Sequence, residues 1–248
     1  MQDRIDLCAE KFMELFGAKP TTNEGNDAEF MRLLQRFIFG EVCYTGCLDN
    51  KERELITITC LAVNQTYPQL KAHTNACLKV GCTPVEIRET IYQCAPFIGF
   101  PKTLNAIATM NEVFTANQIS LPIPEQITIK DEDRFQVGLK MRKDLCGEVD
   151  EKEFDWLPKE FAEAIPRYCA EFVFGDYLSR SGLDLKFREL LVVVIITALG
   201  GGDSQLKLHI NAALKAGNTK EAILTALLHA MPYIGLPRFM TALEIFKS

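Results

Sequence analysis

The sequence has few of the residues on which several common functions depend. Its 248 residues include three histidines and one tryptophan, and none of its nine cysteines forms a Cys-x-x-Cys pair. So few candidate ligands make a poor metal site, and we expect neither a metal nor a cofactor. The odd number and scatter of the cysteines indicate reduced thiols in a reducing compartment rather than a disulfide framework.

Long runs of one kind of residue are also missing. There is no Lys/Arg run and the formal net charge is -6, which argues against nucleic acid or an anionic membrane as the main partner. The longest apolar run, Leu190 to Leu199, is too short for a bilayer, which needs about 20 residues. The chain also starts unlike a secretory signal. We therefore expect a cytoplasmic protein that binds a small molecule or another protein.

What the sequence does contain is an internal repeat. RELITITCLAVNQTYPQLKAHTNACLKVGCTPVEI aligns with RELLVVVIITALGGGDSQLKLHINAALKAGNTKEAI, and APFIGFPKTLNAI aligns with MPYIGLPRFMTAL. A weaker similarity relates Arg4–Gly17 to Arg134–Gly147. We predict two domains, residues 1–117 and 131–248, joined by a Pro-containing linker at 118–130.

Apolar residues at helical spacing predict helices in both copies. The runs LITITCLAV and LLVVVIITAL are rich in β-branched residues and would also suit a buried strand, but no other strand-like run exists to pair with them. The fold class is therefore all-α, with two tandem helical domains packed as a pseudo-dimer. The predicted helices span 3–17, 28–42, 49–63, 69–80, 83–94 and 103–114, then 132–145, 158–177, 184–199, 204–216, 219–230 and 237–246.

The repeat places a glutamate and a histidine in each copy, Glu54 with His73 and Glu189 with His209. Both histidines lie on the apolar stripe of their helices and should point inward. In an antiparallel helical hairpin the axial mismatch between each glutamate and its histidine is only about 5 Å, so the side chains could meet. A buried carboxylate–imidazole pair is a candidate for proton transfer. The alternative is a structural core pair with a neutral histidine.

Two further residues have weaker patterns. Cys77 follows His73 by one helical turn and could form a Cys–His nucleophile, but its counterpart in the second copy is Ala213. His229 has Gln93 as its counterpart and is interpreted as incidental.

Each copy also contains a rigid Pro-x-x-Gly-x-Pro turn, at Pro96–Pro101 and Pro232–Pro237. The prolines are expected to break one helix and to direct the next. The rings of Phe97 and Tyr233 could equally wall a substrate pocket.

Four motifs follow one another in each copy: Arg-Glu-Leu at the start of an apolar helix, one His about 20 residues later, a Thr-capped helix and then Tyr/Phe-x-Gly-x-Pro. In this order they resemble the carboxymuconolactone decarboxylase family, within the alkylhydroperoxidase D-like superfamily. The resemblance covers nearly the whole chain and is closer in the second half. It implies an all-helical fold whose copies form dimers and whose dimers form trimers. A tandem chain would supply the dimer by itself and assemble as a homotrimer.

The resemblance also implies a carbon-carbon lyase that decarboxylates a carboxylated γ-lactone. It makes His73 or His209 the proton donor, with Glu54 or Glu189 orienting the histidine or acting with it. Arg53 and Arg188 could anchor the substrate carboxylate. For the arginines, an outward-facing structural ion pair is the alternative. Where a Trp is usual in these decarboxylases, the chain has Cys43-Tyr44 and Tyr177-Leu178, which leaves the substrate open.

Thiol peroxidases of the superfamily carry a Cys-x-x-Cys before the histidine. Those positions hold Thr66 and Gln69 in the first copy and Gly202 and Gln205 in the second, so a peroxidase would lack its nucleophile and its resolving partner. The sequence therefore predicts a decarboxylase-like enzyme. A helical protein that binds a small acid or a protein partner without catalysis is the alternative, and a thiol peroxidase is the least favoured.

Overall fold

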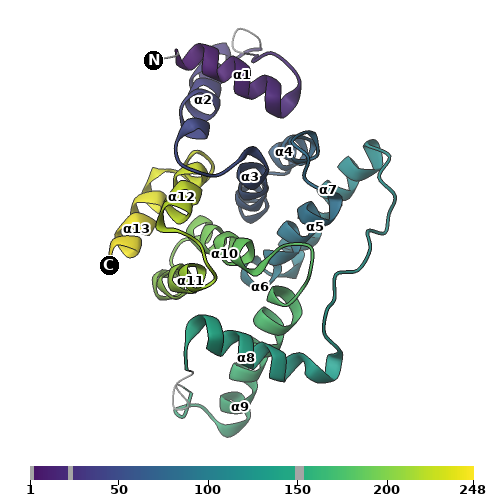
Figure 1. Cartoon of the computed structure of the whole chain (residues 1–248), viewed down its shortest axis with the longest axis vertical. Helices are drawn as coiled ribbons and strands as arrows, with labels where there is room; N and C mark the ends of the chain where they lie inside the picture. The colour runs from purple at the N-terminus through teal and green to yellow at the C-terminus, as the bar shows by residue number, and fades with distance from the viewer. Residues whose placement is uncertain (1–2, 22–24, 149–153) are drawn as a thin grey trace.

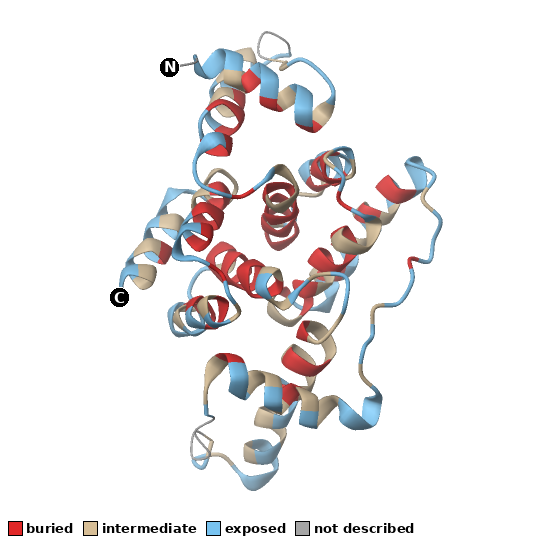
Figure 2. Cartoon of the chain, in the orientation of Figure 1, coloured by how far each residue is buried: buried red, intermediate tan, exposed pale blue. Residues whose placement is uncertain are grey.

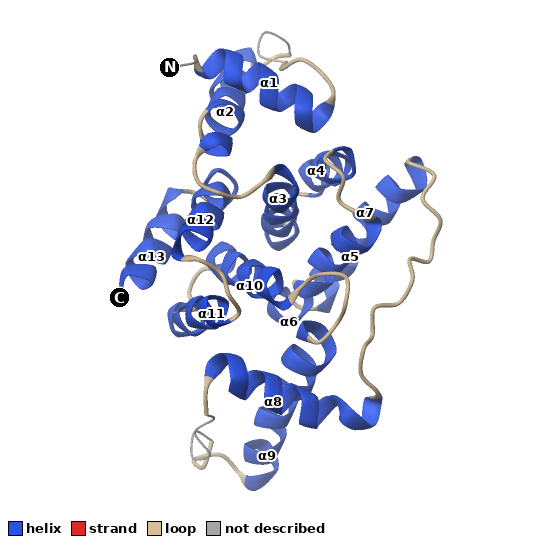
Figure 3. Cartoon of the chain, viewed as in Figure 1, coloured by secondary structure: helices blue, strands red, loops and turns tan. Residues whose placement is uncertain are grey.

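The computed structural model describes residues 3–21, 25–148 and 154–248 (Figure 1). The predicted domains at 1–117 and 131–248 thus each include residues outside this part. The described residues form helices and loops without strands (Figure 3), which confirms the all-α prediction. The helices are α1 (Arg4–Phe16), α2 (Ala28–Gly40), α3 (Asn50–Asn64), α4 (Tyr67–Lys79), α5 (Pro84–Gln93), α6 (Ala95–Ile98), α7 (Phe100–Ala116), α8 (Arg134–Cys146), α9 (Lys159–Tyr168), α10 (Leu185–Leu199), α11 (Asp203–Lys215), α12 (Lys220–Ile234) and α13 (Leu236–Lys247).

Several helix ends follow from local side-chain chemistry. The Asp49 carboxylate accepts a hydrogen bond from the backbone N–H of Glu52, and the Glu52 carboxylate accepts one from the N–H of Asp49, which forms a capping box at the start of α3. Thr83 and Glu86 form the same arrangement at the start of α5. Helix α1 ends at Gly17, whose φ of 68° is a left-handed conformation that glycine adopts without strain.

Three predicted helix ends differ from the structure by three or more residues. Helix α7 begins at Phe100 instead of near residue 103, because a proline such as Pro101 is tolerated in the first turn of a helix. Helix α12 continues through Pro232 to Ile234 instead of ending near residue 230, because a proline removes a single backbone donor and the surrounding turns are held by the core. The predicted helix at 158–177 is α-helical only to Tyr168. It continues as the π-helix Cys169–Leu178, beyond Pro166, which interrupts the regular ladder.

The two β-branched runs form the centre of the molecule. Helices α3 and α10 contact each other, and their residues 53–63 and 188–198 are buried (Figure 2). One hydrophobic cluster includes residues of both copies. Each central helix also contacts a helix of the opposite copy, α3 with α12 and α10 with α5. The two repeats therefore interlock around one core as a pseudo-dimer.

The outer helices complete this arrangement. In Figure 1 helices α1 and α2 lie at one end of the molecule and α8 and α9 at the other. Residues 118–130 contain no helix and run along the outside between α7 and α8. None of the helices in the described ranges combines the length and apolarity needed to span a bilayer.

Candidate active site

Each glutamate of the repeat meets its histidine. Nδ1 of His73 on α4 lies 2.7 Å from Oε2 of Glu54 on α3. In the second copy, Nδ1 of His209 on α11 lies 2.9 Å from Oε2 of Glu189 on α10. All four side chains are at most 10% exposed. The predicted contact across the helical hairpin is confirmed in both copies.

The direction of these hydrogen bonds fixes which imidazole nitrogen can exchange a proton. An ionised carboxylate only accepts, so Nδ1–H of each histidine donates to its glutamate. The other nitrogen, Nε2, has no hydrogen-bond partner among the described residues in either copy. A carboxylate that orients an imidazole in this way leaves Nε2 available to give or take a proton.

An aromatic ring from the opposite copy stands beside each histidine. The Tyr233 ring on α12 lies 5.9 Å from the His73 ring, centroid to centroid, and almost perpendicular to it. The Phe97 ring on α6 lies 6.0 Å from the His209 ring in the same orientation. Phe16 on α1, which the motifs did not single out, adds a third ring 5.5 Å from His73. Each site is therefore completed across the interface between the two copies.

The arginines beside the glutamates are buried rather than outward-facing. Arg53 is 3% exposed and Arg188 is 0% exposed. Their donors are engaged inside the fold, which favours a structural role over binding of a substrate carboxylate. Arg53 donates to the backbone carbonyls of Leu48, Val42 and Thr45, and Arg188 to the carbonyls of Leu183 and Ser181 and to the side chains of Gln93 and Glu89.

Glu89 on α5 links both copies through two arginines. It accepts hydrogen bonds of 2.8 and 3.0 Å from Arg180 and one of 3.0 Å from Arg188. Burial opposes ionisation of Glu89, but the two guanidinium groups outweigh it and lower the pKa of the carboxyl. No sequence pattern points to this group, because the internal alignment places Thr225 opposite Glu89.

His229 on α12 is not incidental, contrary to the expectation from its unmatched position. Its Nδ1 lies 3.4 Å from the Arg53 guanidinium and its Nε2 lies 3.0 Å from Oγ1 of Thr57. Because arginine only donates, Nδ1 accepts and the neutral ring has its proton on Nε2, which donates to Thr57. Thr57 in turn donates to the carbonyl oxygen of Arg53. His229 therefore ties α12 to the central helix of the other copy.

The burial of His229 predicts loss of stability in acid. Burial disfavours the charged ring, and the charges of Arg53 and His73 add to this, so the pKa of His229 falls from 6.5 to about 3. The unfolded chain binds this proton below about pH 6.5 whereas the folded chain does so only near pH 3. This group should therefore lower the free energy of unfolding as the pH falls between these values, by about 1.4 kcal/mol per pH unit.

His229→Gln, which introduces the residue found at the matching position 93, should remove that contribution. Urea unfolding at pH 7, 6 and 5 measures it as a difference in slope between the two proteins, whatever their stabilities at pH 7. Parallel pH dependences would contradict the assignment.

The cysteines near the sites are poor nucleophiles. Cys77 is fully buried, and burial together with the neighbouring Cys82 raises the pKa of its thiol well above the ordinary value. Burial also raises the pKa of Cys43 and of Cys94 to about 12. Thiols that stay protonated do not suit the Cys–His nucleophile considered for Cys77. Within the described ranges, no group of three or more His, Cys, Asp and Glu side chains is placed to hold a metal ion.

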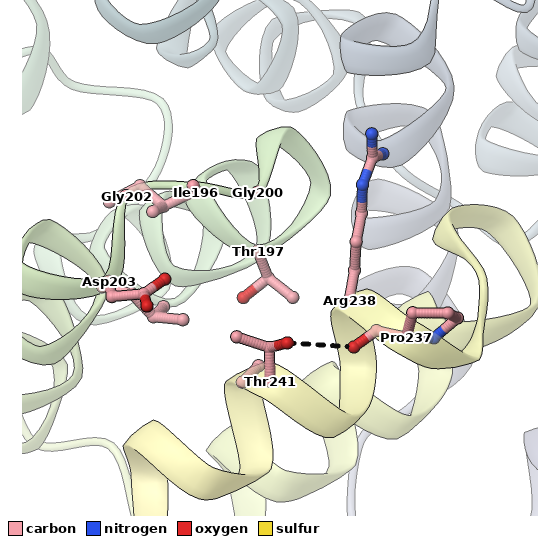
Figure 4. Close-up of a pocket in the computed structure, with 11 residues that line it drawn as sticks. Ile196, Thr197, Gly200, Gly202, Asp203, Pro237, Arg238 and Thr241 are labelled. Carbon is pink, nitrogen blue, oxygen red and sulfur yellow. Dashed lines mark hydrogen bonds between the residues drawn. The ribbon is translucent and has the colours of Figure 1, made fainter.

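A cavity of about 170 Å³ lies between α10, α11 and α13 (Figure 4). Its lining includes Asp203 and Thr197 but neither Glu189 nor His209. Three of its polar side chains donate to nearby backbone carbonyls: Thr197 to Val193, Arg238 to Ala198 and Thr241 to Pro237. The cavity is therefore separate from the Glu–His pairs.

A sequence model described as the carboxymuconolactone decarboxylase family matches residues 28–112 and 163–248, together more than half of the chain. The chain belongs to the carboxymuconolactone decarboxylase family. The two matched stretches confirm the tandem copies predicted from the repeat, and each contains one Glu–His pair.

Individual relatives agree with this assignment. The chain is 30% identical over 124 residues to a 4-carboxymuconolactone decarboxylase of Acinetobacter baylyi, covering 92% of that protein and 48% of this chain. It is 26% identical over 125 residues to nitrosuccinic acid decarboxylase npaB of Metarhizium robertsii, covering 84% of that protein and 48% of this chain. A crystal structure from Burkholderia xenovorans, described as a candidate gamma-carboxymuconolactone decarboxylase subunit, shares the fold with a TM-score of 0.59 at 20% identity, over 98% of this chain and 95% of that one.

Proposed function

We propose that the chain is a decarboxylase that acts on a small carboxylated lactone or a similar acid. The observation that supports this most is the pair of buried Glu–His hydrogen bonds, each with an unpartnered Nε2 within the described part of the chain. The two relatives named above are both decarboxylases, although their names specify different acids. Decarboxylation is therefore better supported than any one substrate.

The reaction needs one proton and an apolar setting. When the bond between the substrate carbon and its carboxylate breaks, carbon dioxide leaves and the electron pair is delocalised as a dienolate. His73 or His209 would then deliver the Nε2 proton to carbon, with Glu54 or Glu189 holding the ring in position. The rings of Phe97 and Tyr233 would keep water from the substrate, which favours a transition state whose charge is more dispersed than that of the carboxylate.

Release of carbon dioxide from carboxymuconolactone tests this proposal. Folded wild-type protein should release one equivalent of carbon dioxide per lactone and should form a product with a new carbon–hydrogen bond. Binding of the lactone without release would favour the non-catalytic binding protein instead. The absence of both binding and release would exclude this substrate.

We also propose that three chains assemble. Helix α2 exposes Phe30 and Leu33, each 63% accessible, and Phe37, 40% accessible, while Ile38 on the same helix is buried. A stripe of three large apolar side chains on one helix is a surface that another chain would cover.

Light scattering should give a mass near three times the 27.9 kDa of one chain. Phe30→Lys combined with Leu33→Lys should lower this mass, because lysines at the contact would have to be buried. A wild-type mass of a single chain would exclude the trimer.

A further inference from the structure

The hydroxyl group of Tyr233 is buried beside His73 yet has no hydrogen-bond partner in the part of the chain that the structure describes. The residue itself is held in place, since its backbone carbonyl accepts a 2.9 Å hydrogen bond from Asn64. A buried hydroxyl without a hydrogen-bond partner destabilises the folded protein. Such a group is therefore a candidate for contact with a bound molecule.

The Thr57 side chain is near enough to this hydroxyl to favour its ionised form slightly, but the two groups make no hydrogen bond of normal geometry. The polar groups around the hydroxyl bond to other partners. Thr57 accepts from His229 and donates to Arg53, and both nitrogens of His229 are used. Oε2 of Glu54 is bonded to His73. Burial and the nearby negative charge of Glu54 raise the pKa of the Tyr233 phenol well above its ordinary value, so the group keeps its proton and remains a donor.

The second site has no equivalent hydroxyl. The residue matching Tyr233 is Phe97, and Val192 stands where the first copy has Thr57. Three buried side-chain donors on α5 lack a described partner, namely Nε of Arg88, Oγ1 of Thr90 and Nε2 of Gln93, and the last of them lies one helical turn before Phe97. The Gln93 oxygen accepts from Arg188. The two sites thus offer different donors at different positions.

We propose that the Tyr233 hydroxyl donates a hydrogen bond to the carbonyl oxygen of the substrate in the Glu54–His73 site, and that the two sites therefore differ in the substrate oxygen that they recognise. This inference rests on the proposed decarboxylation. In that reaction the electron pair of the broken carbon–carboxylate bond moves to this oxygen as carbon dioxide leaves, and His73 then protonates carbon. A donor aimed at the oxygen that gains charge stabilises the transition state more than the substrate.

Tyr233→Phe tests the hydroxyl without removing the ring. The substitution is made in a chain with His209→Ala, so that only the Glu54–His73 site works, and turnover of carboxymuconolactone is measured. We expect kcat to fall about 10²-fold, the usual effect of losing one such donor, with KM changed less than threefold. Tyr92→Phe on α5 is the matched control, and it should leave both constants within twofold of the His209→Ala parent.

An unchanged kcat in the Tyr233→Phe chain, or equal losses at positions 233 and 92, would overturn the inference. If wild type releases no carbon dioxide, the decarboxylase proposal fails by itself, and calorimetry with 5-oxotetrahydrofuran-2-carboxylate decides the role of Tyr233. Binding about tenfold weaker in Tyr233→Phe than in Tyr92→Phe supports the hydrogen bond. Equal affinities, or no binding to wild type, would overturn it.

Discussion

Replacing Glu89 with alanine is expected to lower the free energy of unfolding by about 3–5 kcal/mol. Glu89 is fully buried and pairs with Arg188, which is 0% exposed, and with the partly buried Arg180. Removing one partner of a buried ion pair leaves the other charges in a medium that solvates them poorly. Arg188 lies on α10 directly before Glu189, so we expect the Glu189–His209 site to be perturbed more than the Glu54–His73 site. Urea unfolding at pH 7 measures the change.

Thr225 offers a matched control, because it occupies the place of Glu89 in the other copy. Its hydroxyl donates to the Glu221 carbonyl and accepts from the N–H of Cys47, and it pairs with no charge. Thr225→Ala should therefore cost only about 1 kcal/mol. A loss below about 1 kcal/mol for Glu89→Ala would show that the ion pairs contribute little to stability.

Removing both histidines is expected to lower the turnover of carboxymuconolactone by about 10²–10⁴-fold, the usual contribution of a positioned general acid. His73→Ala or His209→Ala alone should leave the contribution of the other site. Steady-state carbon dioxide release from the two single variants and the double variant measures each site separately. Circular dichroism spectra and melting temperatures would confirm that all three proteins are folded.

Cys77→Ala is the control for these histidine variants, because alanine is the natural residue at the matching position 213. Cys77 lies one helical turn from His73, and burial raises the pKa of its thiol, so loss of the thiol should leave turnover unchanged. A loss comparable to that of His73→Ala would revive the Cys–His nucleophile.

The sequence predicts the helices and the Glu–His contacts because both depend on local spacing. The capping boxes at Asp49 and Thr83 and the positions of Glu54 and His73 along one hairpin require no knowledge of the rest of the fold. The internal repeat helps further, because the same helix order and the same Glu–His spacing occur in both copies. The two β-branched runs, residues 55–63 and 190–199, are locally ambiguous between helix and strand, and in the structure both form helices at the centre of the core.

The contacts between the copies are not predictable in the same way. Helix α12 brings His229 and Tyr233 to the first pair, while Glu89 joins arginines of the second copy. His229 and Glu89 differ from their counterparts in the other repeat, Gln93 and Thr225, so the internal alignment makes them look unimportant. Arg53 and Arg188 are also not predictable from local sequence. Each precedes a glutamate, which suggests an ion pair on the surface, but in the structure both arginines are buried.

Decarboxylation in deuterium oxide tests the central claim most directly. With wild-type protein, the product of carboxymuconolactone should contain one carbon-bound deuterium, delivered to a single face of the carbon, as detected by NMR spectroscopy. The folded His73→Ala/His209→Ala protein should form this product at least about 10²-fold more slowly. Equal rates and the same stereochemistry in both proteins would show that the two Glu–His pairs are structural and that the proton comes from elsewhere.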